Sequence, residues 1–240
     1  MADVTRRGQS ATTIRTIDLP AEHTAALVDL LVAEVLDRRS VALVAPPDAI
    51  EEPDVLRWVD GSSVYTVAGA TLYTSTRILD AEARLIGAAG RRDGSAVEQA
   101  AVELAMLEMA ANGTALDAGQ ASLVRRICTS GARLQLAIAP AGAGKTTAMR
   151  ALTLAWTEDG GQVVGLAPSA AAAAVLAEHT GIRTDTLAKL TWSLDHGNLS
   201  EWVAAVGPTT LVIIDEAAMA DTLSLDTALQ FAIGRVRAYD

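Results

Sequence analysis

Residues 139–147 of this 240-residue sequence are Ala139-Pro140-Ala141-Gly142-Ala143-Gly144-Lys145-Thr146-Thr147. The apolar run before them, Leu134 to Ala139, predicts a buried parallel strand. The run after them, Thr147 to Glu158, predicts a helix that Gly160-Gly161 closes. A strand, a glycine loop and a helix that opens on Lys-Thr form the context of a phosphate-binding loop. The sequence therefore predicts an α/β fold with a phosphate site at this turn.

Each residue type in the loop has a physical role in holding phosphate. Gly142 and Gly144 let the backbone fold tightly enough for successive N–H groups to point at phosphate oxygens. The helix N-terminus adds a partial positive charge, Lys145 adds a full one, and the Thr146 hydroxyl can ligate Mg²⁺. Ala139 replaces the usual first glycine, which suits an α or β backbone but not a positive φ. The expected nucleotide-binding residues of the loop are Gly142, Ala143, Gly144, Lys145, Thr146 and Thr147.

The composition limits the classes of protein to which this chain can belong. Half of the residues are hydrophobic, so a sizeable core is available. The formal charge of −10 argues against a surface coated with nucleic-acid-binding charge, although a local basic groove survives such a total. Cys128 is alone, which indicates a reducing compartment. No signal peptide or membrane-spanning stretch is recognised, so we expect a cytoplasmic protein without a membrane segment.

The half of the sequence before the loop predicts a small α+β region. Helices are expected at 21–39, 76–89 and 96–111, short strands at 41–45 and 71–73, and a hairpin across 55–67 around Asp60-Gly61. We expect the helix at 21–39 to carry its leucines on one side. The expected organisation is a loose N-terminus at 1–17, a small α+β region at 18–113 and a lobe at 114–240 that contains the glycine loop.

Strand and helix patterns alternate around the loop. Asp117 and Gln120 can form a capping box at the start of the last helix before it. After it we expect a strand at 162–167, a helix capped by Ser169 and ended by Gly181, a helix at 185–194, a strand at 210–214 and a helix at 222–233. Such alternation predicts a parallel sheet flanked by helices.

An acidic couple, Asp215-Glu216, follows the apolar strand predicted at 210–214. Asp215 can hold magnesium at the carboxyl edge of the sheet, where ligands bind in such folds. Glu216 can orient and deprotonate a water that attacks the γ-phosphoryl group. Acidic pairs at strand ends also occur as helix caps, but the upstream Lys145-Thr146 favours the hydrolase interpretation. The expected catalytic residues are Lys145 and Glu216, and the expected metal ligands are Thr146 and Asp215.

The motifs together resemble those of RecD-like superfamily-1 DNA helicases. The resemblance rests on Gln120, the loop at 139–147, and the stretches at 165–170, 184–187 and 215–218. Together with the stretch at 73–90, they are most similar to the helicase part of conjugative relaxases of the TraI/TrwC (MobF) type, over about residues 20–234.

The resemblance implies a RecA-like P-loop NTPase fold that uses ATP and Mg²⁺ and binds single-stranded DNA. It implies that Gln120 contacts adenine. It also implies that residues 167–170 and 184–187 touch DNA phosphates. The DNA-contacting residues expected from these stretches are Pro168, Ser169, Thr184 and Thr186.

Two departures from the family alter the expected activity. The histidines are scattered and no tyrosine precedes Tyr65, so no relaxase nicking activity is predicted. The chain stops before the Gly-Asp-x-Gln strand and the second lobe of the family, so we expect a truncated fragment or a lobe completed by a second chain. The alternatives left open are a nucleotide-binding but inactive remnant and an interaction module. Trp192 and Trp202 could stack on bases, but packing is the favoured role.

Overall fold

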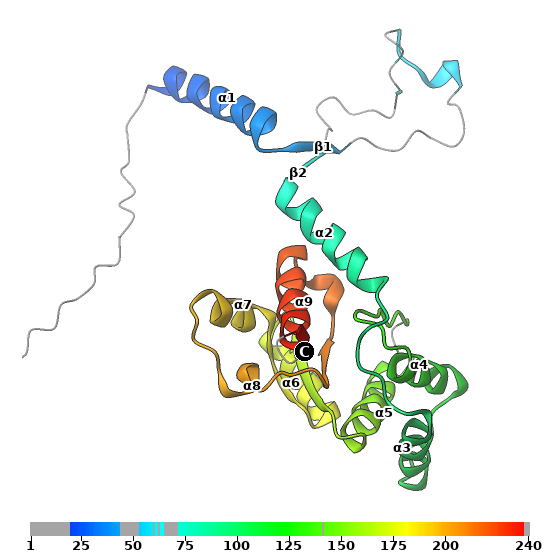
Figure 1. The fold of residues 1–240 in the computed structure, drawn as a ribbon. Helices are drawn as coiled ribbons and strands as arrows, with labels where there is room; N and C mark the ends of the chain where they lie inside the picture. The colour runs from blue at the N-terminus through cyan, green and yellow to red at the C-terminus, as the bar shows by residue number, and fades with distance from the viewer. Residues whose placement is uncertain are drawn as a thin grey trace, which may run out of the picture. The chain divides into compact units, whose positions relative to one another are not determined.

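The computed structural model describes residues 20–43, 53–59, 61, 63–64, 72–140 and 142–237 (Figure 1). The chain divides into two compact units, Met1–Thr76 and Arg77–Asp240, and each is described by itself. The expected loose N-terminus at 1–17 lies outside the described residues. The three-part organisation expected from the sequence stays a prediction.

The first unit contains one helix and a small antiparallel sheet. Its elements are α1 (Ala21–Arg38), β1 (Val41–Leu43), the 3₁₀ turn η1 (Asp54–Leu56) and β2 (Leu72–Thr74). β1 pairs with β2, so that Val41 lies opposite Thr74. The leucines of α1 that we expected on one side, Leu27, Leu30, Leu31 and Leu36, are exposed.

The hairpin predicted at 55–67 is only partly present. The chain does reverse around Gly61, because Arg57 and Ser63 form an isolated antiparallel bridge. The strand predicted at its start is wrong, since the chain forms the 3₁₀ turn η1 there. That turn follows Pro53, whose fixed φ suits a tight turn and whose carbonyl accepts from the N–H of Leu56 at 2.9 Å. Residues 65–67 lie outside the described part of the chain.

The second unit is an α/β lobe. Its helices are α2 (Thr76–Ala89, which begins at the boundary), α3 (Gln99–Ala111), α4 (Ala118–Thr129), α5 (Lys145–Glu158), α6 (Ala170–Thr180), α7 (Leu187–Asp195), α8 (Glu201–Ala204) and α9 (Thr222–Arg237). Its strands are β3 (Gln162–Ala167), β4 (Arg183–Thr186) and β5 (Thr210–Ile214), and the 3₁₀ turn η2 (Ala217–Met219) follows β5. The predicted strands at 162–167 and 210–214 are confirmed.

The three strands of the lobe form a parallel sheet in the order β4-β3-β5. Side chains alternate between its faces, as the pleat requires. Val163 and Ile213 join a core cluster with α3, α4 and α5, whereas Val164 and Leu166 join a second cluster with α7, α8 and α9. The green helices α3, α4 and α5 lie together in Figure 1. The predicted fold, a parallel sheet flanked by helices, is confirmed.

The helix caps within the lobe follow the residues that predicted them. Asp117 and Gln120 form a reciprocal capping box at the start of α4. The Ser169 hydroxyl accepts from the N–H of Ala172, and Gly181 ends α6 with a φ of +73°. Elsewhere in the lobe, the Arg84 guanidinium of α2 forms an ion pair with the buried carboxylate of Asp226 in α9, with a shortest N–O distance of 2.6 Å.

Three predictions for the lobe need correction. The strand predicted at Leu134 to Ala139 is wrong, because residues 134–140 are irregular and pair with no strand of the described sheet. The helix predicted at 185–194 starts at Leu187, and the strand β4 precedes it; the polar run Arg183 to Thr186 has no apolar pattern to predict a strand. The final helix continues to Arg237 rather than ending at Ile233.

Candidate functional site

The glycine loop has the backbone conformation that the sequence demands. Gly142 and Gly144 adopt φ values of +76° and +67°, in the left-handed region that favours glycine. The N–H of Ala143 donates to the carbonyl of Pro140 at 3.3 Å, and the helix α5 begins at Lys145. Ala139 does not have a positive φ, as its side chain requires. The loop thus ends on a helix N-terminus, where free N–H groups and the helix dipole favour an anion.

The side chain of Lys145 folds back over the loop. Its Nζ donates to the carbonyl of Ala139 at 3.0 Å, and the residue is half-buried. This hydrogen bond uses one of the three N–H donors of the ammonium group and holds the group beside the first residue of the loop. The two remaining donors are enough to bind an anionic ligand there.

Gln120 contacts the loop from the side of α4. Its Nε2 group donates to the carbonyls of Ala143 and Gly144 at 3.3 and 3.4 Å. Its Oε1 atom accepts from the N–H of Asp117 at 3.0 Å within the capping box. The predicted capping role of Gln120 is therefore confirmed. Its contact with the glycine loop was not predicted from the sequence.

The acidic couple stands at the carboxyl end of β5. The N–H of Asp215 donates to the carbonyl of Leu166 at 3.0 Å, which extends the ladder between β5 and β3 by one residue. The Asp215 carboxylate accepts from the N–H of Glu216 at 2.9 Å. Glu216 has a φ of +52° and is the one non-glycine residue of the described chain with a positive φ. Such conformations cost free energy and occur most often at functional sites.

The described contacts do not join the two halves of the expected site. A hollow of about 500 Å³ beside the loop is lined by Thr146, Thr147, Arg150 and the end of α6, residues 178–181. No hydrogen bond or ion pair among the described residues links the loop at 142–147 to Asp215 or Glu216. Since residues 134–140 lie outside the sheet, no strand fixes the loop to the edge at which β5 ends.

The hydroxyl groups expected to touch DNA already have partners within the protein. Ser169 caps α6, Thr184 donates to the carbonyl of Ala173 at 2.7 Å, and Thr186 accepts from the N–H of Lys189 at 3.1 Å. Pro168 and Thr186 lie near the carboxyl ends of β3 and β4, whereas Thr184 lies two residues earlier on β4. A role of these residues in binding DNA stays a prediction.

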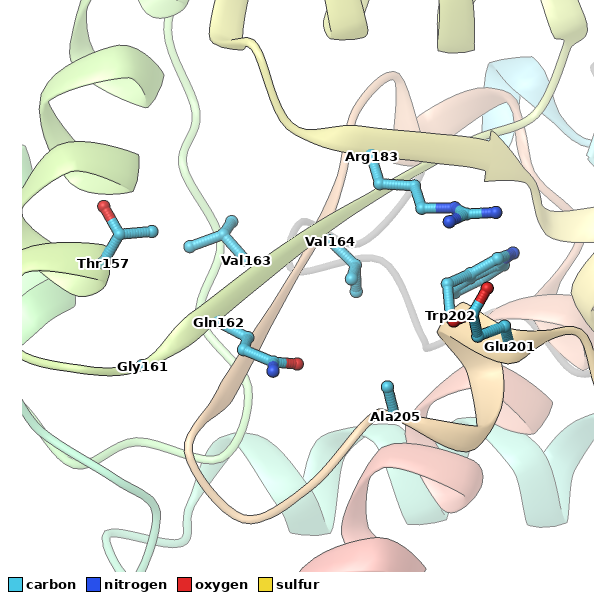
Figure 2. Close-up of a pocket in the computed structure, with 9 residues that line it drawn as sticks. All are labelled: Thr157, Gly161, Gln162, Val163, Val164, Arg183, Glu201, Trp202 and Ala205. Atoms are coloured by element: carbon cyan, nitrogen blue, oxygen red, sulfur yellow. The ribbon is translucent and has the colours of Figure 1, made fainter.

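A second cavity, of about 390 Å³, contains none of the residues expected from the sequence. Gln162 and Arg183, which begin β3 and β4, place it at the amino edge of the sheet. Figure 2 shows the side chains of Arg183 and Glu201 beside the ring of Trp202. Ligands of open α/β sheets bind at the carboxyl edge, so this cavity is not the expected phosphate site.

Trp192 and Trp202, two of the three tryptophans of the lobe, differ in their surroundings. Trp202 is 7% exposed and packs in the core cluster with α9, so its packing role is confirmed. Trp192 is 52% exposed and stacks on the His196 ring, with ring centroids 4.3 Å apart.

Burial raises the pKa of the Cys128 thiol to about 12, so this cysteine is not a nucleophile at neutral pH.

The described residues hold neither a cluster of metal-binding side chains nor a membrane-spanning helix. The described part of the chain contains no group of three or more His, Cys, Asp or Glu side chains that could hold a metal ion. A magnesium ion bound largely by nucleotide phosphates needs no such group, and hydroxyl and carboxylate oxygens are ligands of the kind it prefers. Within the same part of the chain, no helix has the length and apolar character to cross a bilayer.

Comparison with known proteins gives one family. Residues 115–237, more than half of the chain, match the family model described as AAA domain. No curated protein matches the chain. The match begins just before the capping box of α4, includes the glycine loop and the acidic couple, and ends with α9. The chain belongs to the AAA domain family, and residues 115–237 are a P-loop ATPase domain of the kind that binds a nucleotide and typically Mg²⁺.

Proposed function

We propose that this chain is the ATP-binding and ATP-hydrolysing lobe of a DNA helicase of the conjugative relaxase type. The observation that supports it most is the glycine loop, whose two positive-φ glycines and Lys145 open helix α5 within the AAA domain match. The motif set that resembles TraI/TrwC-type helicases carries the finer assignment.

The proposed chemistry is hydrolysis of the γ-phosphoryl bond of ATP. The loop N–H groups and Lys145 bind the phosphates, while Thr146 and Asp215 would hold Mg²⁺. Glu216 orients a water molecule and takes its proton as the water oxygen bonds to phosphorus and ADP leaves. The reaction requires Asp215 and Glu216 to reach the loop, so we propose that residues 134–140 join the sheet in the active state.

The proposed partner is single-stranded DNA, held near the carboxyl ends of β3 and β4. Pro168, Ser169, Thr184 and Thr186 are the proposed contacts. Of these, Ser169 and Thr186 stand at helix N-termini, where phosphate oxygens are favoured. A second helicase lobe, which could belong to another chain, would close over the nucleotide.

Nucleotide binding is tested by titration of fluorescent mant-ATP in the presence of Mg²⁺. The chain has two lysines, so Lys145→Ala has a natural control in Lys189→Ala, whose ammonium group pairs with Asp185 at 2.6 Å. We expect Lys145→Ala to weaken binding about 10- to 100-fold, because it removes charge-assisted hydrogen bonds to phosphate. Equal binding by Lys145→Ala and the wild type would refute the proposed site.

Hydrolysis is tested separately by phosphate release with and without single-stranded DNA. We expect Glu216→Gln to bind mant-ATP like the wild type but to release phosphate far more slowly, because an amide cannot take the proton of the water. If the wild type binds ATP and releases no more phosphate than Glu216→Gln, with or without DNA, the chain is a nucleotide-binding module rather than an ATPase.

A further inference from the structure

The amide of Gln120 has hydrogen-bond partners at both of its ends. Its Oε1 atom accepts from the backbone N–H of Asp117, and its Nε2 group faces the carbonyls of Ala143 and Gly144. A backbone N–H needs an acceptor and a carbonyl needs a donor, so these partners fix which end of the amide points where. The Nε2 group uses both of its donors in these contacts, whereas the Oε1 atom keeps a second lone pair.

The two carbonyls that Gln120 contacts belong to the phosphate-binding peptides. A peptide unit is planar, so holding its C=O group also sets the direction of the N–H on its other side. The carbonyl of Ala143 shares a peptide with the N–H of Gly144, and the carbonyl of Gly144 shares one with the N–H of Lys145. The carbonyl of Gly144 also accepts from the helix N–H groups of Thr147 and Ala148 at 3.0 and 3.2 Å. Gln120 therefore has most influence on the peptide that carries the N–H of Gly144.

The packing at Gly144 shows how closely the amide approaches the loop. A Cβ atom at this position would lie 2.2 Å from Gln120 Nε2, so any side chain would displace the glutamine. Gly144 also has a φ of +67°. The glycine thus serves both the left-handed turn and the approach of Gln120.

We propose that Gln120 is a positioning residue that orients the peptide between Ala143 and Gly144, so that it affects the binding of the phosphates of any nucleotide. This inference rests on the proposed nucleotide site. It differs from the role implied by the family resemblance, because a contact with adenine would distinguish ATP from GTP. A contact that positions the loop affects all polyphosphates alike.

The test uses a ligand that has no base. Binding of inorganic tripolyphosphate, ATP and GTP, each with Mg²⁺, is measured by calorimetry on the full chain and on two variants, Gln120→Ala and Gln120→Glu. Glutamate keeps the acceptor of the capping box but cannot donate to the loop carbonyls. We expect both variants to lose about 5- to 10-fold in affinity for all three ligands, a loss consistent with one or two modest hydrogen bonds.

The control is Asp117→Ala, which breaks the capping box and leaves the Gln120 amide in place. We expect it to lower the melting temperature while tripolyphosphate affinity stays within twofold of the wild type. The proposal is overturned if the Gln120 variants lose affinity for ATP alone, or bind every ligand like the wild type. It is also overturned if Asp117→Ala weakens tripolyphosphate as much as they do. A wild-type chain that binds none of the ligands refutes the nucleotide site itself.

Discussion

The acidic couple and the glycine loop differ in how they are held. Asp215 follows β5, which is paired to β3 along its whole length and packs into both core clusters. The loop follows residues 134–140, here named the approach segment, which pair with no described strand. Leu136 and Ile138 of this segment are 75% and 91% exposed. The sequences of β5 and of the approach segment are nevertheless alike, since each is an apolar run followed by residues of the candidate site.

The difference shows that an apolar run needs a neighbour to become a strand. β5 has β3 beside it in parallel register, and the ladder satisfies its backbone groups. At the start of the approach segment, the N–H of Arg133 donates to the carbonyl of Arg91 and the Gln135 amide donates to the carbonyl of Ile127. At its end, the carbonyl of Ala139 accepts from Lys145 Nζ. Local pattern alone carries no information about that neighbour.

The largest expected effect comes from a matched pair of isoleucines, one in each region. Ile213 of β5 is 8% exposed in the first core cluster, so Ile213→Ala should lower the free energy of unfolding by about 2–5 kcal/mol. Ile138→Ala should change it by less than about 0.5 kcal/mol, because that side chain is in solvent. Urea unfolding of the two variants, followed by circular dichroism, measures both.

The same pair reports on the active state. If the approach segment joins the sheet when nucleotide binds, Ile138→Ala should become costly only in saturating Mg²⁺ and ATP. A large cost without nucleotide would mean that Ile138 is buried in solution and that the two regions are alike after all.

The sequence predicted the parts of the lobe that depend on near neighbours in the chain. The capping box of Asp117 and Gln120, the cap of Ser169 and the strand at β5 are all encoded within a few residues. It missed β4, whose Arg-Thr-Asp-Thr sequence is polar and becomes a strand only because β3 lies beside it. It also missed the contact of Gln120 with the loop, since that contact spans 23 residues and has no periodic signal.

A pair of glycines gives the next effect, one in the loop and one on β3, the strand that pairs with β5. A Cβ atom at Gly165 of β3 would lie 2.7 Å from Leu176 Cδ2 and 2.8 Å from Thr184 Cγ2. Gly165→Ala should therefore cost about 1–3 kcal/mol of stability through overpacking. Gly142→Ala has open space but a φ of +76°, so we expect a cost of only about 1 kcal/mol.

Ligand binding separates these two glycine variants. Gly142→Ala should weaken tripolyphosphate binding, because the loop must keep its turn, whereas Gly165→Ala should leave binding unchanged in the folded fraction. Thermal unfolding and calorimetry on the same samples make the comparison. The reverse order of effects would show that the loop is more tightly packed than the sheet.

Ion pairs of Asp93 with Arg91 and with Arg133, the residue just before the approach segment, make a smaller, pH-dependent contribution to the free energy of unfolding. Hydrogen bonds from Arg91 and Arg133 hold the pKa of Asp93 well below its usual value of 3.8. Its contribution to stability is therefore complete above about pH 4 and is lost as the pH falls toward the lowered pKa. Asp93→Asn should be less stable than the wild type at pH 6, and the gap in stability should begin to narrow below about pH 4. Urea midpoints measured from pH 6 to pH 2 check this, and equal midpoints at pH 6 would show that the ion pair contributes nothing.

The smallest effect concerns α5, the helix that runs from the loop to the start of β3. The Thr153 hydroxyl is buried there and has no hydrogen-bond partner among the described residues. Thr153→Val keeps the shape and removes the unsatisfied group, so it should raise the free energy of unfolding by up to about 1 kcal/mol. Thr157→Val is the control, because its exposed hydroxyl donates to the Thr153 carbonyl at 2.9 Å and water can replace it. If Thr153→Val is instead destabilising, the Thr153 hydroxyl has a hydrogen-bond partner in solution, and the surroundings of α5 differ from those described.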